Sequence, residues 1–304
     1  MMGINLNVDL GGGLTLDNPV LTASGTFGFG HQYSEFIDLN RLGGFIVKGT
    51  TLEPRQGNPA PRLVETPSGM INAVGLQNPG VECFARDIYP TLTDFESKVI
   101  VNISGAQISD YVQVAEILAP LEKVSAIEVN ISCPNVKGGG MSFGTSPEMA
   151  AEVTSAIRRV WPRHMMVKLT PNVTSVVDIA QAVEDAGADS VSLINTFLAM
   201  SIDVERRKAC LSTITGGLSG PAIRPIAVRM VWQVARAVNI PVVGLGGIMD
   251  ASDALQFIMA GATAVQVGTA NFIDPAASVK VVEGIEDYCE RHNISDINEL
   301  RGII

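Results

Sequence analysis

A cysteine at the end of an apolar stretch is well placed for acid–base or nucleophilic chemistry. Residues 127–135 begin as a β-branched run that is typical of a buried strand. Pro134 cannot donate to a sheet ladder, so the strand is expected to end near Cys133, before the glycine-rich segment 137–140. Most cysteines are simply buried and inert. In barrel enzymes, however, the exit of a strand is where chemistry takes place.

Few other side chains could carry catalysis. The three histidines are His31 in a loop, His164 before a strand and His292 near the C-terminus. There is no G-x-S-x-G motif, which disfavours a Ser–His hydrolase. The predicted strand ends lack clusters of histidine and carboxylate, so no metal site is expected. Since a free thiol has a pKa of about 8.5, modest tuning brings it close to working pH, and Cys133 is the favoured base or nucleophile.

Polar residues recur at the ends of the predicted strands. A single lysine there can reach solvent, and a single asparagine can cap a turn. Buried lysine is rare unless it is paired, however, and two strands end in one. Matching polarity at eight strand ends therefore favours one shared site. The residues are Ser24, Lys48, Asn102, Asn130, Lys168, Asn195, Thr196, Gly246, Gly247, Gly268 and Thr269.

The glycines at the last two strand ends indicate a phosphate site. Backbone N–H groups at such positions, followed by a helix start, bind phosphate in many unrelated barrels. The segment 218–221 could add a further donor. Two lysines and several amides beside a phosphate fit flavin mononucleotide (FMN). Lys48 or Lys168 could then stabilise the reduced, anionic flavin ring.

The elements that position these residues follow a repeating pattern. Eight apolar segments alternate with helical patterns, which predicts a (β/α)8 barrel. Residues 221–238 show helical spacing of apolar residues, and Ser146 with Pro147, and Asp250, indicate helix starts. A doubly wound sheet is disfavoured because no G-x-G-x-x-G follows the first strand. The predicted strands are residues 19–25, 43–50, 98–104, 127–135, 164–170, 189–196, 241–247 and 264–269.

Three further segments complete the predicted fold. Residues 6–8 and 14–16 flank three glycines and predict an N-terminal β-hairpin at the bottom of the barrel. Residues 52–78 and 199–217 exceed the usual barrel length and predict inserted loops or strands at the C-terminal face. We expect residues 1–304 to form a single domain.

Composition limits the class of protein. The chain has 304 residues, 46% of them hydrophobic, and a formal net charge of −10, without a lysine- or arginine-rich block that would indicate nucleic acid binding. Its four cysteines form no CxxC pair, which fits a reducing cytoplasm. The first ten residues lack the basic region of a signal peptide, and the longest uncharged stretch, 254–272, is too polar to span a membrane.

Six segments, taken together and in this order, resemble dihydroorotate dehydrogenase over nearly the whole chain. They are residues 130–135 (Asn-Ile-Ser-Cys-Pro-Asn), 168–172 (Lys-Leu-Thr-Pro-Asn), 195–196, 216–221 (Gly-Gly-Leu-Ser-Gly-Pro), 246–247 and 268–269. Segment 136–144 looks like class 1B, the NAD-linked branch. Class 2 enzymes carry serine at the base position and a membrane-associating extension, so Cys133 and the N-terminal sequence disfavour that class.

The resemblance implies a role for each matching position. Cys133 would be the base that takes a proton from C5 of dihydroorotate, while the hydride from C6 passes to N5 of FMN. The glycine-rich segment after Cys133 would be a lid that excludes water. The flavin positions are Ser24, Lys48, Gly49, Asn102, Asn130, Lys168, Ile194, Gly220, Gly246, Gly247, Gly268 and Thr269. The substrate positions are Lys48, Asn72, Ala73, Val74, Gly75, Leu76, Asn130, Asn195 and Thr196.

The resemblance also implies a partner. Class 1B enzymes use a second subunit that carries FAD and a [2Fe-2S] cluster and passes electrons to NAD⁺. This chain has neither a cysteine cluster nor a dinucleotide fingerprint for those groups. A heterotetramer of two catalytic and two electron-transfer subunits is therefore expected, acting in pyrimidine (UMP) synthesis.

Other functions stay open at this stage. One is a flavin dehydrogenase of the dihydropyrimidine type, which would also use a cysteine acid. Another is a fumarate-linked class 1A dihydroorotate dehydrogenase. A third is a flavin-free isomerase or lyase in which Lys168 forms a Schiff base. The last is a binding subunit without catalysis.

Overall fold

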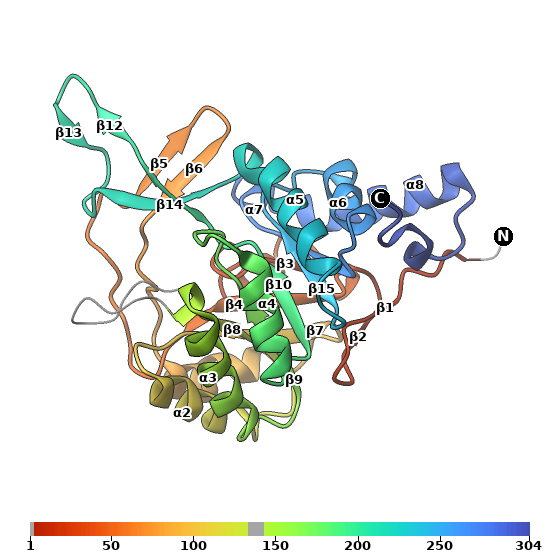
Figure 1. The fold of residues 1–304 in the computed structure, drawn as a ribbon, viewed down its shortest axis with the longest axis horizontal. Helices are drawn as coiled ribbons and strands as arrows, with labels where there is room; N and C mark the ends of the chain where they lie inside the picture. Colours follow the sequence, from red (N-terminus) through yellow and green to blue (C-terminus); the bar gives the residue numbers. More distant parts are fainter. Residues whose placement is uncertain (1–2, 133–142) are drawn as a thin grey trace.

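The structure, a computed structural model, describes residues 3–132 and 143–304 and contains a closed barrel of eight parallel strands. Helices surround the barrel (Figure 1), so the predicted (β/α)8 fold is confirmed. All eight predicted strands are present, in sequence order around the barrel. They are β3 (Val20–Thr22), β4 (Gly44–Thr50), β7 (Lys98–Ile103), β8 (Val124–Asn130), β9 (His164–Lys168), β10 (Ser190–Leu193), β15 (Val242–Leu245) and β16 (Ala264–Val267).

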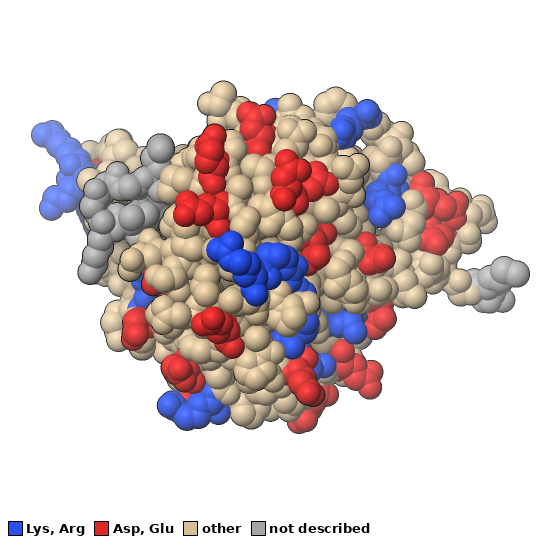
Figure 2. Space-filling view, turned by 60° about the horizontal axis from the view of Figure 1, so that its bottom comes forward, with Lys and Arg blue, Asp and Glu red and all other residues tan. Residues whose placement is uncertain are grey.

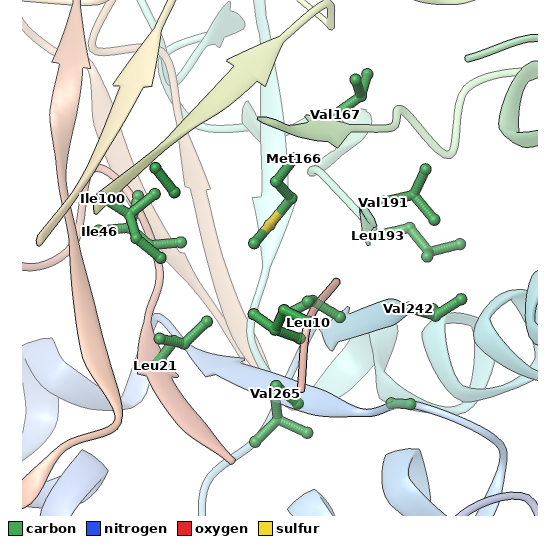
Figure 3. Packing of buried hydrophobic residues seen from close by; sticks show 14 of the residues in the cluster. Leu10, Leu21, Ile46, Ile100, Met166, Val167, Val191, Leu193, Val242 and Val265 are labelled. Carbon is green, nitrogen blue, oxygen red and sulfur yellow. The ribbon is translucent and has the colours of Figure 1, made fainter. Parts of the chain in front are cut away.

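The barrel strands are apolar because they are covered on both faces. The outer face packs against helices, and the inner face fills the barrel. Figure 3 shows Leu10, which precedes the hairpin turn, in one buried cluster with Leu21, Ile46, Ile100 and Met166. These side chains form an apolar packed core inside the barrel.

The helices start where local sequence predicts. Ser146 accepts a hydrogen bond from the Met149 amide and Asp250 accepts one from the Asp253 amide, so both predicted N-caps are confirmed. The predicted helix 221–238 is a 3₁₀ turn, η6 (Pro221–Ile223), followed by α5 (Arg224–Ala235). The other main helices are α2 (Ile108–Leu118), α3 (Pro147–Arg158), α4 (Val176–Asp185), α6 (Ala251–Met259), α7 (Ala270–Ile273) and α8 (Ala277–His292).

An N-terminal hairpin closes the bottom of the barrel, as the glycine run predicted. Strands β1 (Val8–Asp9) and β2 (Thr15–Leu16) pair antiparallel. The carbonyl of Gly11, in the turn, lies 2.9 Å from Nδ1 of the buried His164, whose Nε2 lies 2.8 Å from the Ser190 hydroxyl. Burial is the main cause that lowers the pKa of His164. A hydrogen bond between Gly11 and this buried histidine thus attaches the hairpin to the barrel.

Both predicted insertions form strands beside the mouth of the barrel. Strands β11 (Phe197–Met200), β14 (Thr215–Ser219), β6 (Gly69–Asn72) and β5 (Leu63–Thr66) make an antiparallel sheet in that order. With the hairpin β12 (Ile202–Asp203) and β13 (Lys208–Ala209), this sheet forms an arm that projects from the barrel (Figure 1). The arm and its loops expose the apolar side chains of Leu63, Leu198, Met200, Ile202, Val204 and Ile214.

Charge is mixed on the face that Figure 2 presents, where acidic and basic side chains are interspersed. That face offers no continuous basic surface of the kind that binds a phosphate backbone. Within residues 3–132 and 143–304, no helix combines the length and apolar character needed to cross a bilayer.

Candidate active site

Asn130 marks the point where β8 stops. Its side-chain oxygen accepts a hydrogen bond from the Ser132 amide at 3.2 Å, an arrangement that turns the backbone out of the sheet. The strand therefore ends at Asn130, three residues before the expected end near Cys133. Cys133 itself, and residues 134–142 of the predicted lid, lie outside the described residues. The end of β8 thus places Asn130 at the mouth of the barrel.

A buried ion pair lies at the same end of the barrel. Lys168, the last residue of β9, has its Nζ 3.4 Å from Oε1 of Glu128 on β8. The side chain of Lys168 is 6% exposed and that of Glu128 is fully buried. Paired burial explains how a strand can end in a lysine inside the fold.

Glu128 is a residue of this candidate site that sequence reasoning missed. Besides Lys168, it accepts hydrogen bonds from Asn102 Nδ2 at 2.7 Å, Ser192 Oγ at 2.9 Å and Gln266 Nε2 at 2.7 Å. These donors come from β7, β10 and β16, and Lys168 comes from β9. One carboxylate on β8 therefore accepts hydrogen bonds from four other strands. The sequence feature that could have identified it is a single acidic residue in an otherwise apolar strand, because a buried charge needs partners.

Asn102 offers an acceptor that fits a flavin. Its Oδ1 is buried and has no hydrogen-bond partner among the described residues. A side chain at Gly49 would bring its Cβ to 2.9 Å from that oxygen, so glycine keeps the approach open. Since buried polar atoms are normally satisfied, an orphaned acceptor in a polar site indicates a missing donor. The N–H on the pyrimidine edge of FMN is such a donor, and the residues present therefore fit the cofactor.

Lys48 is a second cation at this end of the barrel. It lies in β4 and is partly buried, and its Nζ is 3.5 Å from the position a Cβ would take on Gly25, beside Ser24. Burial lowers the pKa of Lys48 below its usual value, and the positive charge of Arg62 adds to that effect. An anion bound here would favour the charged form of the lysine.

Two asparagines join across the mouth. Asn195 donates from Nδ2 to Oδ1 of Asn130 at 3.2 Å, while its own oxygen accepts from the Thr196 amide at 2.8 Å. Asn172, which belongs to the motif 168–172, donates to the Thr196 carbonyl at 2.9 Å and holds that turn. The structure thus brings together three predicted substrate positions, Asn130, Asn195 and Thr196.

The predicted substrate segment 72–76 lies beside the flavin positions. Its Leu76 Cδ2 would be 3.5 Å from a Cβ on Gly49, so the segment reaches the same region as Asn102. Asn72 donates from its amide to the Gly217 carbonyl at 3.3 Å. The carbonyls of Ala73 and Val74 accept hydrogen bonds from Asn58, and Gly75 packs closely against the same residue.

The glycine positions meet on the other side of the mouth. A Cβ on Gly247 would lie 2.6 Å from the Gly220 carbonyl, and one on Gly246 would lie 3.4 Å from Ile194 Cγ1. Ser219 and Thr269 hydroxyls are joined at 2.9 Å. Around Gly268 there is more room, because its nearest neighbour would be Ala23 Cβ at 3.3 Å. These predicted phosphate positions thus form one cluster.

Hollows of about 460 Å³ also lie elsewhere on the surface of the described residues, and two of them can be compared with the barrel mouth. One is lined by residues 34–39 and Phe95, and the other by the end of α5, the loop before β15 and the last residues of the chain. Neither brings together the polar side chains found at the barrel mouth. The chemistry of the side chains, not the size of a hollow, therefore marks the candidate site.

The strand ends of this (β/α)8 barrel present two cations, several carboxamides and a glycine cluster at the end where barrel enzymes carry their active sites, so fold and site define an enzyme-type barrel. Comparison with known proteins makes this class specific. The family model for dihydroorotate dehydrogenase matches residues 6–289. This chain belongs to the dihydroorotate dehydrogenase family.

Curated relatives match over nearly their full lengths. A protein of Bacteroides thetaiotaomicron is 58% identical over 304 residues, which cover 100% of this chain and 99% of the relative. One from Porphyromonas gingivalis is 56% identical (98% and 97% covered), and one from Alkaliphilus oremlandii is 55% identical (98% of each). Each is named dihydroorotate dehydrogenase B (NAD⁺), catalytic subunit. The resemblance found in the sequence motifs is thereby confirmed.

Proposed function

We propose that this chain oxidises (S)-dihydroorotate to orotate, in an NAD⁺-linked enzyme of pyrimidine synthesis. The observation that carries the proposal is the joining of Asn130 and Asn195 at the barrel end that also holds Lys48 and Lys168. Orotate is a planar anion edged with amide donors and acceptors. Carboxamides can both donate and accept, and a lysine suits the carboxylate. The site and the names of the full-length relatives support the same substrate.

FMN is the cofactor we propose for the site. When bound, it would supply a hydride acceptor at its N5 atom. Asn102 would accept from the pyrimidine N–H, and Lys168 would neutralise charge on the reduced ring. The backbone of Gly220, Gly246, Gly247 and Gly268, with Thr269, would hold the phosphate. The remaining flavin positions are Ser24, Lys48, Gly49, Asn130 and Ile194.

The substrate would lie between the cofactor and Cys133, which we propose as the base that removes the proton from C5. Lys48 would hold the carboxylate of the substrate, together with Asn72 and the backbone of Ala73, Val74, Gly75 and Leu76. Asn130, Asn195 and Thr196 would bind its amide edge. Residues 1–304 would form one FMN-binding domain, which the closed barrel and its continuous core support.

We further propose a second subunit that carries FAD and a [2Fe-2S] cluster, in a cytoplasmic heterotetramer with two copies of each chain. The relatives are named as catalytic subunits, which supports a partner. The exposed apolar side chains of the arm support burial in an assembly, because large apolar patches on proteins mark contact sites.

The purified chain tests the proposal. It should be yellow, with visible absorption bands of a flavin, and should oxidise dihydroorotate with an artificial dye but not with NAD⁺ alone. Dihydrouracil should be a poor substrate because it lacks the carboxylate that Lys48 would hold. A colourless protein that binds no FMN on titration would overturn the proposal. Direct reduction of fumarate would contradict the NAD⁺-linked assignment.

A further inference from the structure

We propose that Glu128 is a positioning residue of this active site, which fixes the Asn102 carboxamide and balances the charge of Lys168. The inference rests on the FMN site proposed above and extends it to a residue that would not touch substrate. Three features of the buried network support it: the number of donors that meet at Glu128, the orientation it imposes on amides, and the charge it places beside Lys168.

Glu128 is the centre of the network, not a peripheral member. Its Oε1 accepts from Asn102 at 2.7 Å and from Lys168 at 3.4 Å, and its Oε2 accepts from Ser192 and Gln266 at 2.9 and 2.7 Å. Stability alone gives little reason for a carboxylate here, because a well-packed apolar replacement of a buried ion pair is often as stable. A charge at this depth therefore indicates a role in the site above it.

The carboxylate also decides which way two amides face. It can only accept hydrogen bonds, so Asn102 and Gln266 must turn their NH₂ groups toward it. Their carbonyl oxygens, Asn102 Oδ1 and Gln266 Oε1, are buried and without a partner among the described residues. Glu128 thereby makes Asn102 a fixed acceptor beside Gly49, where a ligand N–H would bind.

Charge is the third feature. A lone cation near a flavin stabilises its reduced, anionic form and raises its reduction potential. Because Glu128 is fully buried and pairs with Lys168, the two side chains together carry no net charge. The potential of the bound flavin should thus depend on the pair and not on the lysine alone.

Glu128→Gln removes the negative charge of Glu128 with little change in the shape of the side chain. The Ser192 hydroxyl can rotate and the Gln266 amide can turn its carbonyl toward the new NH₂ group, so the network can stay satisfied. The measurement is the two-electron midpoint potential of the full chain at saturating FMN. We expect at least a tenfold stronger preference for reduced over oxidised FMN, which is a positive shift of about 30 mV. Lys168→Gln should shift the potential in the negative direction, and the double variant should return close to wild type.

Asp189→Asn is the matched control. Asp189 is also a carboxylate on the barrel, held by Arg158 at 2.8 Å, but it lies at the opposite end beside the hairpin. This variant should lose stability and keep the wild-type potential. A shift equal to that of Glu128→Gln would show a general effect of barrel damage and would overturn the inference.

The outcomes separate the inference from the proposed function. FMN bound to Glu128→Gln with an unchanged potential overturns the role of Glu128 and leaves the proposed function standing. Should that variant fail to fold, the double variant decides, because it contains no unpaired buried charge. A double variant with the same low potential as Lys168→Gln alone overturns the inference. Wild-type protein that binds no FMN overturns the proposed function itself.

Discussion

Asn195 donates a hydrogen bond over 3.2 Å to Asn130, and this contact joins the carboxyl ends of two barrel strands that are not neighbours. Strand β9, which ends in Lys168, lies between them. The Oδ1 atom of Asn130 also accepts from the Ser132 amide. Two donors on one oxygen fix the carboxamide and leave its NH₂ group without a partner among the described residues, available to a ligand.

Asn195→Ala should weaken catalysis more than folding. It removes one donor from Asn130 and one proposed substrate contact, and a lost hydrogen bond of this kind costs about 1–3 kcal/mol. We expect kcat/KM for dihydroorotate to fall about 5- to 150-fold with little change in the unfolding free energy. Gln233→Ala, which removes only the bond from Arg229 on α5, is the control and should leave both quantities nearly unchanged. Full activity of Asn195→Ala would contradict the substrate role.

Lys48→Met should lower the affinity for orotate. A charged hydrogen bond to a carboxylate is worth about 1.5–3 kcal/mol, so the dissociation constant should rise by roughly 10- to 150-fold. Burial lowers the pKa of Lys48, so in the wild type the lysine loses its proton below its usual pKa of 10.5. Orotate should therefore bind tightly at neutral pH and more weakly as the pH rises through the lowered pKa.

Calorimetric titration across that pH range measures both effects. Binding to the wild type at a pH near the lowered pKa should take up a proton, because the orotate carboxylate favours the charged lysine. Lys48→Met should lack both the proton uptake and the pH dependence. Identical pH profiles for the two proteins would exclude Lys48 as the group that holds the carboxylate.

His164→Gln should remove part of the acid sensitivity of the fold. Burial lowers the pKa of His164 in the folded state below its usual value of 6.5, so the unfolded chain binds a proton first as the pH falls. This contribution to stability is complete above pH 6.5 and is lost as the pH falls toward the lowered pKa. The slope is at most about 1.4 kcal/mol per pH unit for one proton. Urea unfolding at pH 7.5 and 5.5 measures it.

His292→Gln is the control for that experiment, since His292 lies exposed near the end of α8. It shows the effect of losing an imidazole that is not part of the buried core. His164→Gln should be less stable at pH 7.5, because the bonds to Gly11 and Ser190 change, but should lose less on acidification. Equal slopes for His164→Gln and wild type would assign the acid sensitivity to other groups.

Gly12→Ala and Gly13→Ala form a matched pair that tests how the hairpin seats on the barrel. Both glycines have positive φ, 54° and 79°, so alanine strains the backbone at either position by about 1 kcal/mol. A Cβ on Gly12 would also lie 2.5 Å from Asp189 Cγ, whereas Gly13 has nothing within 4 Å. Gly12→Ala should therefore cost about 1–3 kcal/mol more than Gly13→Ala in chemical unfolding. Equal losses would show that the hairpin does not pack against Asp189.

Much of this structure follows from local sequence. Each barrel strand is an apolar run short enough for a buried parallel sheet, and Ser146 and Asp250 are residue types that cap helices, so the elements and their order could be predicted. The end of β8 was placed three residues too late. Pro134 limits how far the strand can extend. The Asn130 side chain ends the strand earlier, because it accepts a hydrogen bond from the Ser132 amide two residues further along.

The sequence by itself determined the barrel, the polarity of its strand ends and, through the ordered motifs, the family. The tertiary structure decided which of those polar groups act together. The four donors that meet at Glu128 are 26, 40, 64 and 138 residues away from it along the chain. Only closure of the sheet brings these donors within 3.4 Å of the carboxylate. In the sequence, Glu128 is merely an acid in an apolar strand. Because the closed barrel removes water from this carboxylate, its charge is tolerated only through the donors that the same barrel supplies.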